Sequence, residues 1–198
     1  MATLRAPSSL PTTAASPSLT PPLLSWLSGV WNVTHSTLPM WKKSRNVQIT
    51  YNAIPSTSPA QIDDLVTYQN LTSDKVKTVK GVDKPFEVPN TEAAGEADGS
   101  EKASLGYNWR GKGLLMIATS KWEILGYGDE EGTGNSWVVT YFAKTLFTPA
   151  GIDFYSRKGA LAPQTIEDIK TGLKGLGGDL ANLAENIFEV KMDEARTG

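Results

Sequence analysis

The feature that most constrains the fold is a series of short β-rich segments that fills residues 30–156 without a helical segment between its members. Apolar and polar residues alternate within these segments, and Gly-containing turns separate them, a pattern typical of strands that bury one face. The predicted strands span residues 30–37, 46–54, 64–71, 76–82, 104–110, 114–120, 122–126, 136–145 and 152–156. Consecutive strands without interposed helices favour a meandering antiparallel barrel or sandwich over a parallel α/β sheet.

The residues after the last predicted strand carry a different periodicity. Apolar residues recur there at steps of three and four from Ile166 to Ile187, which places them on one face of a helix. Gly177 and Gly178 resemble a helix end followed by a new N-cap, so two short helices are predicted. The favoured interpretation is a helical segment packed on the outside of the barrel. A dimerisation face, and hence a homodimer, is the alternative.

One barrel domain with its helical segment is predicted over residues 23–190. Residues 1–22 are rich in Pro, Ser, Thr and Ala, and are predicted to be disordered because they can bury little apolar surface. Residues 191–198 are predicted to form a tail. The apolar patch at residues 23–27 is predicted to form one turn that closes an end of the fold. The polar, acidic stretch 85–102 is either a surface loop or a lid over the barrel mouth.

Charge and cysteine content exclude several classes of function. The 198-residue chain has 19 Lys and Arg, 21 Asp and Glu, a net charge of −2 and no basic stripe, so nucleic acid is not an expected partner. No run approaches the roughly 20 apolar residues of a membrane span, and no membrane partner is predicted. The absence of Cys excludes disulfides and thiolate catalysis. With prolines where a signal peptide needs an apolar run, it favours a cytoplasmic protein.

The chain has one histidine, His35, and no motif for binding phosphate, a dinucleotide or a catalytic zinc, or for activating a serine nucleophile. One histidine cannot build a histidine-rich metal site, so neither a metal nor a cofactor is predicted. His35 shares a strand face with Trp31 and Val33. If that face lines the barrel, His35 can act as a general acid or base. A hydrogen-bonded structural histidine is the alternative.

Strand alternation assigns other large side chains to inward faces. The predicted inward sets include Ile49 with Tyr51, Tyr107 with Trp109, Leu114 with Met116, and Trp137 with Tyr141. Buried tyrosine hydroxyls and indole N–H groups need hydrogen-bond partners. Aromatic walls with a few polar tips are typical of a small-molecule pocket, and they suit a filled core as well.

The carboxylates differ in their expected surroundings. Asp63 and Asp64 begin a predicted strand and are expected to be solvated. Glu123 lies between two apolar residues in a strand, so alternation points it outward. Asp153 also lies within a strand and is the better candidate for a functional site.

Three features in sequence order resemble the lipocalins of the calycin superfamily. They are Gly29-Val30-Trp31 at the start of the first strand, Arg157 after the last strand, and a helix beyond it. In that family the Trp closes the barrel floor and the Arg packs on it, so the resemblance implies these roles for Trp31 and Arg157. It also implies a mostly β, antiparallel up-and-down barrel with a C-terminal helix. The Thr-Asp-Tyr element of many lipocalins is missing, as are the disulfide and signal peptide of secreted carriers, which argues against extracellular transport.

The resemblance implies that a mostly apolar small molecule binds inside the barrel, as in intracellular lipocalin-like cyclases, isomerases and decarboxylases. The predicted function is a cofactor-free rearrangement of such a metabolite, of the cyclase, isomerase or lyase type, as in natural-product biosynthesis. His35, Tyr51 and Tyr141 would act as acids or hydrogen-bond donors. The residues predicted to shape the pocket are Val33, Ile49, Tyr107, Trp109, Met116 and Trp137. The alternatives are a non-catalytic intracellular carrier of a fatty or aromatic ligand, and an interaction module with a filled barrel.

Overall fold

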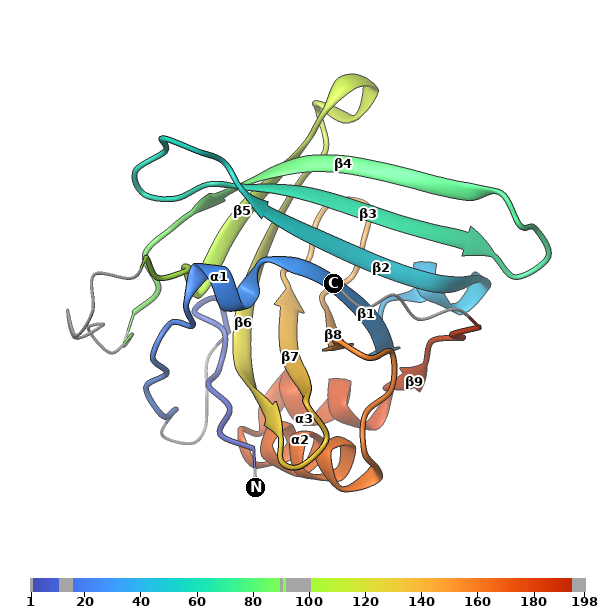
Figure 1. The fold of residues 1–198 in the computed structure, drawn as a ribbon. Coiled ribbons are helices and arrows are strands. Elements are labelled where there is room, and N and C mark those ends of the chain that lie inside the picture. The colour runs from blue at the N-terminus through green and yellow to red at the C-terminus, as the bar shows by residue number, and fades with distance from the viewer. Residues whose placement is uncertain (1, 11–15, 90, 92–100, 194–198) are drawn as a thin grey trace.

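The computed structural model describes residues 2–10, 16–89, 91 and 101–193, and most of its regular structure is antiparallel β-sheet (Figure 1). The strands are β1 (Gly29–Ser36), β2 (Ser44–Ala53), β3 (Ile62–Asn70), β4 (Val76–Pro85), β5 (Gly106–Gly111), β6 (Thr119–Glu130), β7 (Asn135–Phe142), β8 (Gly151–Ser156) and β9 (Phe188–Glu189). The helices are α1 (Leu24–Leu27), α2 (Pro163–Gly175) and α3 (Gly178–Glu185), with 3-10 turns η1 (Pro39–Lys43) and η2 (Gly113–Leu115). No helix in these residues is long and apolar enough to cross a membrane.

Strands β1 to β8 form a closed barrel. Each strand pairs antiparallel with its sequence neighbours, and β1 pairs with both β2 and β8, which closes the sheet. The short β9 pairs with β1 at His35 and Ser36, on the side of β1 opposite β8. The predicted fold class, a mostly β up-and-down barrel followed by C-terminal helices, is therefore confirmed.

Connections in an up-and-down barrel alternate between its two ends. The β2–β3, β4–β5 and β6–β7 connections lie at the end where β1 begins and where α1 covers the barrel, here called the closed end (Figure 1). The β1–β2, β3–β4, β5–β6 and β7–β8 connections lie at the other end, here called the open end. The single turn of α1 agrees with the turn predicted for residues 23–27.

One predicted strand is wrong. Residues 114–120 were expected to be extended, but η2 and a turn occupy most of this range, and β6 begins only at Thr119. Gly113 has a φ of 63°, a left-handed conformation that ends the extended backbone after β5. Strand β6 then runs on to Glu130 through an irregularity after Ile124, so it is longer than the predicted 122–126.

Helices α2 and α3 pack on the outside of the barrel, against β6, β7 and β8 (Figure 1). Their buried side chains join those of the outward face of the strands in one apolar cluster. Its members include Leu125, Val139, Ile152, Phe154, Ile169, Leu173, Leu180 and Ala184. Gly177, at a φ of 72°, separates the two helices as predicted.

The N-terminal segment also lies against the outer wall. Residues 2–10, here called the N-terminal strap, bury Leu4 and Ala6 in the same outer cluster, and Arg5 is 4% exposed. The Arg5 amide donates to the carbonyl of Leu125 at 2.8 Å. The predicted disorder does not hold for the strap, because Leu4 packs closely over Gly126 of β6 and Gly172 of α2. Residues 1 and 11–15 of the predicted disordered segment lie outside the described residues.

Trp31 and Arg157 form a contact, here called the latch, that closes the floor of the barrel at its closed end. Trp31 is fully buried, and its indole N–H donates to the carbonyl of Leu27 in α1 at 2.7 Å. The guanidinium of Arg157 lies 3.6 Å from the centroid of the Trp31 ring. The same guanidinium donates to the carbonyls of Trp26, Ser28 and Val30, the last two at 2.7 and 2.8 Å. Burial lowers the pKa of Arg157 to about 10. The roles implied by the lipocalin resemblance are those observed.

Candidate functional site

The barrel interior is lined mostly by large side chains. Trp31, Tyr107 and Trp122 are at most 2% exposed. Other side chains that pack against this core are only half-buried. They include Val66, Tyr68, Trp109 and Phe142. Tyr68 and Phe142 lie toward the open ends of β3 and β7, so the open end presents partly accessible aromatic side chains.

Three aromatic rings form a platform in the interior. The Trp122 ring stacks on Tyr51, with centroids 5.5 Å apart and an interplanar angle of 11°. It also stacks on Tyr107 at 4.8 Å and 23°. Their positions on β2, β5 and β6 mean that the platform crosses the barrel rather than following one wall.

Two carboxyl groups lie beside this platform. Asp64 on β3 is paired with Tyr51 on β2, and Asp83 on β4 is paired with Ile62, the next inward-facing residue of β3. Asp64 is 8% exposed and Asp83 is fully buried. The indole N–H of Trp122 donates to Asp83 Oδ1 at 2.7 Å. The second oxygen of Asp83, Oδ2, has no hydrogen-bond partner among the described residues, and neither has Oδ1 of Asp64.

The surroundings of Asp64 and Asp83 raise the pKa of both carboxyl groups. Burial raises the pKa of Asp64 to about 7. Burial also raises the pKa of Asp83, and the charge on Asp64 raises it further, although the hydrogen bond from Trp122 acts in the opposite direction. Asp83 therefore holds its proton to a higher pH than an ordinary Asp does, and Asp64 titrates near pH 7. An acid and a base side by side are the groups that proton transfer needs.

A third carboxyl group lies in the same interior on β8. Asp153 is 1% exposed, and its Oδ1 accepts a hydrogen bond from Ser36 Oγ at 2.5 Å. The indole N–H of Trp41 donates to Oδ2 at 3.3 Å. Burial raises the pKa of Asp153 to about 7 despite these two donors. Both Asp153 oxygens are thus engaged by protein, whereas Asp64 and Asp83 each keep one oxygen unpaired.

The raised pKa of Asp64 predicts how the stability of the protein depends on pH. Because the folded state holds a proton on Asp64 up to about pH 7 while an unfolded Asp loses it near pH 4, the folded state binds more protons in this window. The Asp64→Asn variant, which has no such proton, is expected to gain stability relative to the wild type as pH rises. The expected gain is about 1.4 kcal/mol per pH unit between pH 4 and 7. Urea unfolding of both proteins at pH 5 and 7 measures it, and an unchanged difference would contradict the assigned pKa.

Five of the predicted site residues lie in the barrel interior. Val33, Ile49, Tyr51 and Tyr107 are buried in the inner cluster, and Trp109 packs against it half-buried. The Trp109 indole lies over a glycine on the neighbouring strand, Gly81, where a Cβ would come within 2.0 Å of its Nε1. Strand alternation predicts the faces of β2 and β5 correctly.

The predicted inward orientation of His35 is wrong. A bulge between Val33 and His35 shifts the register of β1 against β8, so His35 pairs with Phe154 of the outer cluster. Its ring lies 5.7 Å from that of Phe154, its Nδ1 is 3.1 Å from Thr34 Oγ1, and Glu189 of β9 is its partner in the sheet. Burial lowers the pKa of His35, although the charge of Glu189 opposes the shift.

Three further predicted positions also lie away from the interior. Trp137 and Tyr141 are buried, but in the outer cluster: β7 alternates regularly along β8, and the predicted face is the outer one. Val138 instead faces inward. Met116 is 63% exposed on the turn that replaces the predicted strand, so it is not part of a buried pocket wall. The catalytic roles of His35 and Tyr141 remain predictions without support from their positions.

The sequence pattern did not identify Asp64 and Asp83 as candidate site residues. Asp64 was expected to be solvated with its neighbour Asp63, but only Asp63 faces outward, where it pairs with Lys112 at 2.5 Å. The one available signal was the alternation of β3, which puts Asp64 on the same face as Ile62 and Val66. The outward orientation predicted for Glu123 is confirmed, since it binds Arg5 of the strap.

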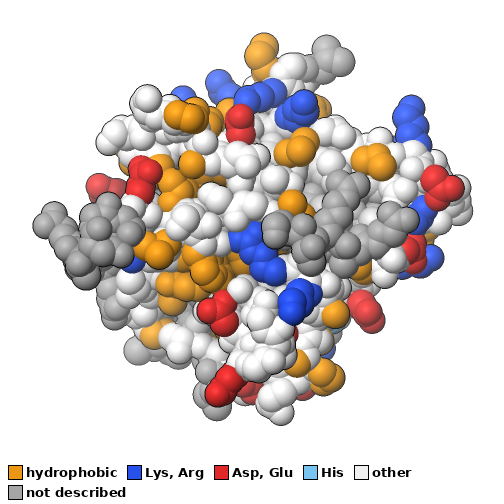
Figure 2. Space-filling view, in the orientation of Figure 1, with side chains coloured by type: hydrophobic (Ala, Val, Ile, Leu, Met, Phe, Trp, Pro, Cys, Tyr) orange, Lys and Arg blue, Asp and Glu red, His pale blue; other side chains and the backbone are white. Residues whose placement is uncertain are grey.

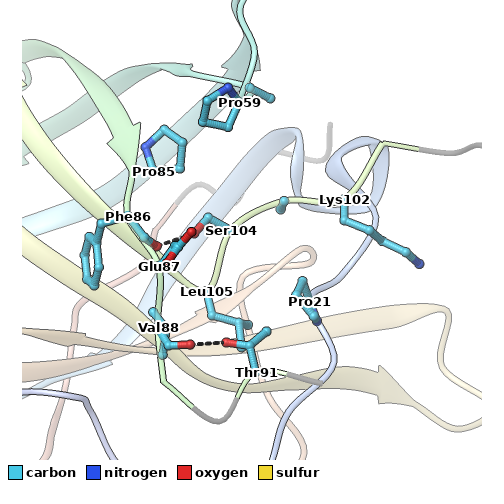
Figure 3. Close-up of a pocket in the computed structure, with 12 residues that line it drawn as sticks. Pro21, Pro59, Pro85, Phe86, Glu87, Val88, Thr91, Lys102, Ser104 and Leu105 are labelled. Carbon is cyan, nitrogen blue, oxygen red and sulfur yellow. Dashed lines mark hydrogen bonds between the residues drawn. The ribbon is translucent and has the colours of Figure 1, made fainter. Parts of the chain in front are cut away.

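A crevice of about 450 Å³ lies at the closed end, between Pro21, Pro59 and the two described ends of the predicted lid stretch (Figure 3). Its hydroxyls are already engaged: Thr91 Oγ1 donates to the carbonyl of Val88 at 2.6 Å, and Ser104 Oγ to that of Phe86 at 3.1 Å. These ends lie away from the open mouth, and the residues between them, 90 and 92–100, are outside the described residues. The crevice is lined by both polar and apolar residues, including Glu87 and Lys102, and lies apart from the buried carboxyl pair of the interior.

Comparisons with known proteins agree with the fold. No protein-family model and no curated protein matches the sequence. Among solved structures, the siderocalin Ex-FABP matches with a TM-score of 0.52 and 11% identity, covering 85% of this chain and 95% of the other. The H1 crustacyanin of the lobster Homarus americanus matches with a TM-score of 0.52 and 12% identity, covering 84% and 77%. The chain therefore has a lipocalin-like fold. In the described residues, no three His, Asp or Glu side chains gather in a way that could hold a metal ion.

Proposed function

We propose that this protein binds a small, mostly apolar molecule in the open half of its barrel and catalyses a cofactor-free rearrangement of it by proton transfer. The observation that carries the proposal is the buried pair Asp64 and Asp83, with one unpaired oxygen on each. Buried polar atoms without a protein partner require another explanation, and a bound molecule with a carbonyl or hydroxyl group supplies one. The half-exposed aromatic residues above the pair suit the apolar body of the same molecule.

The two carboxyl groups divide the chemistry between them. Asp83, in its acid form, donates a proton to a carbonyl oxygen of the bound molecule. Asp64, as a carboxylate, accepts a proton from the carbon next to that carbonyl, so the enol forms without any net gain or loss of protons. Return of a proton to a different carbon, or attack of the enol on a second group of the same molecule, gives an isomer or a cyclic product. Tyr51, next to Asp64 in the sheet, holds the polar end of the substrate.

The solved structures of similar fold support ligand binding in general. Ex-FABP is described as a siderocalin that functions through dual ligand specificities. The second candidate function is a non-catalytic carrier, which the same half-exposed wall of Tyr68, Trp109 and Phe142 favours because a carrier needs only that wall. The unpaired carboxyl oxygens favour the enzyme, since a purely apolar ligand leaves them without partners.

Two measurements on one set of variants test the proposal. Binding is measured by fluorescence of N-phenyl-1-naphthylamine, a neutral apolar probe, and conversion by mass spectrometry of a small-molecule extract from the source organism incubated with the protein. Asp64→Asn is expected to keep probe binding within about threefold and to lower conversion at least about 100-fold, because it removes the proton acceptor. Asp63→Asn is the matched control, since its side chain is the adjacent carboxylate on the outer face, half-exposed.

Each outcome distinguishes the candidates. Probe binding without conversion of any metabolite would support the carrier. Equal conversion by the wild type and Asp64→Asn would show that the acid pair has no catalytic role. A wild-type protein that does not bind the probe has a barrel filled by its own side chains, which would overturn both candidates and leave the interaction module.

A further inference from the structure

The large hydrophobic side chains that the fold leaves exposed gather at one end of the barrel. Among the described residues, all but one belong to the four connections of the open end, at residues 37–43, 71–75, 112–118 and 143–150, and the exception, Val76, begins β4 next to one of them. They are Met40, Leu71, Val76, Leu115, Met116, Ile117, Leu146 and Phe147. Ile117 is 94% exposed, and Leu146 and Phe147 are each 89% exposed. A mouth ringed by apolar tips is unfavourable in water, and contiguous exposed apolar surface marks a binding surface.

The same four segments carry a strong excess of positive charge. With the strand residues that flank them, Arg45 and Lys77, they contain seven Lys or Arg and a single acidic residue, Asp74. The rest of the chain holds the remaining twelve basic and twenty acidic residues, so the overall net charge of −2 hides a positive mouth on a negative body. Figure 2 shows Lys and Arg side chains beside hydrophobic ones at the top of the view, over β4 and the β5–β6 connection.

Two of the seven cations are neutralised by carboxylates. Arg45 binds Asp74 at 2.5 Å and Asp193 at 2.7 Å, and Lys112 binds Asp63 at 2.5 Å. The other five are lysines: Lys42, Lys43, Lys75, Lys77 and Lys144. All five are exposed, and they come from three of the four connections and their flanks. The unpaired positive charge therefore lies beside the apolar tips of three of the four connections.

We propose that the open end of the barrel docks on an anionic lipid surface. Apolar side chains at the tips of separate loops can enter the boundary between headgroups and acyl chains, while lysines around them attract anionic headgroups. The positive mouth and negative body also orient the molecule, since the body is repelled by the surface that attracts the mouth. The sequence-based expectation of no membrane partner considered only segments that span a bilayer, and the structure places these scattered residues together.

Docking in this orientation turns the aromatic mouth of the barrel toward the lipid. An apolar molecule could then pass between bilayer and barrel without crossing water. The docking proposal itself rests on the exposed loops alone, and it stands whether the interior is catalytic, a carrier site or filled.

Vesicle co-sedimentation of the full chain tests the proposal. The probes are vesicles of phosphatidylcholine alone and vesicles with about one third phosphatidylserine. We expect the wild type to bind the phosphatidylserine vesicles at least about tenfold more strongly, and to lose most of this binding in 0.5 M salt, because exposed charges are screened. The double variant Leu146→Ser and Phe147→Ser is expected to weaken binding by at least about tenfold, since both side chains are almost fully exposed and removing them leaves the core intact.

Charge variants provide a matched comparison. Lys43→Glu with Lys144→Glu is expected to abolish the preference for phosphatidylserine. Lys84→Glu with Lys174→Glu changes the net charge equally at exposed positions on β4 near the closed end and on α2, and is expected to have little effect. Equal effects of the two charge variants, or no binding by the wild type, would overturn the proposal. A wild-type dimer that the Leu146→Ser, Phe147→Ser variant converts to a monomer, without vesicle binding, would assign this surface to self-association instead and would also overturn it.

Discussion

Replacing Arg157 by Ala is expected to lower the free energy of unfolding by about 3 kcal/mol or more, because one side chain holds several groups of the closed end together. It covers the Trp31 ring at 3.6 Å and donates to the backbone of α1 and the start of β1. Its removal takes away a donor from each of these part-buried carbonyls and leaves the Trp31 ring without its cation. Thermal unfolding monitored by circular dichroism should show a fall in Tm of about 6–12 °C for a domain of this size.

Two variants separate the contributions of Arg157. Arg157→Lys keeps the charge but not the planar, multiply donating guanidinium, and we expect it to recover only part of the loss. Arg110→Ala is the control, because Arg110 is an exposed arginine on the outer face of β5. A loss below about 1 kcal/mol for Arg157→Ala, the usual range for surface residues, would show that the floor of the barrel does not depend on this latch.

Replacing Glu123 by Ala is expected to destabilise the protein by about 3–5 kcal/mol, because it leaves the buried Arg5 without its counter-charge. The two side chains are 2.6 Å apart and only 5% and 2% exposed. Ser8 contributes both its amide and its hydroxyl to the same carboxylate, at 2.9 and 2.6 Å. The loss should therefore detach the N-terminal strap as well. Urea unfolding measures the stability, and limited proteolysis near residues 2–10 measures the release of the strap.

A double-mutant cycle tests whether the ion pair itself is responsible. Replacing Arg5 by Met and Glu123 by Leu together removes both buried charges, and we expect most of the lost stability to return, as it does when a buried ion pair is exchanged for apolar residues of similar volume. If each single variant and the double variant cost the same, the strap contributes through its apolar contacts at Leu4 and Ala6 alone.

More of the fold than of the site could be predicted from the sequence, because the fold depends on residue patterns that repeat along the chain. Alternation over many segments outweighs one misread strand, and the helical period after Pro163 with the break at Gly177 gave two helices on the outer wall. The Gly-x-Trp motif and Arg157 also predicted one specific contact, that of the Arg157 guanidinium with the Trp31 ring, and the structure contains it. The misread strand follows a glycine whose left-handed conformation the residue pattern does not reveal.

The site depends on individual side-chain directions, and a single bulge reverses all those that follow it. The bulge after Val33 moved His35 to the outer face. Strand β7 has regular alternation, but alternation alone does not say which of its two faces points inward, and Tyr141 lies on the outer one. Tyr51 was assigned correctly because β2 and β3 are in regular register from residue 48 onward. Asp83 could not be recognised because its burial depends on Trp122 and Asp64, which come from distant parts of the chain.

The contact of Arg157 with Trp31 at one end of the barrel and the exposed connections at the other end give the two ends different local stabilities. Amide hydrogens near Trp31, which the Arg157 guanidinium covers, are expected to exchange with solvent mainly when the whole domain unfolds. Those in the exposed connections of the open end are expected to exchange through local openings, which disturb few buried contacts. A loop at the open end can therefore change conformation without disturbing the contacts that hold the closed end together.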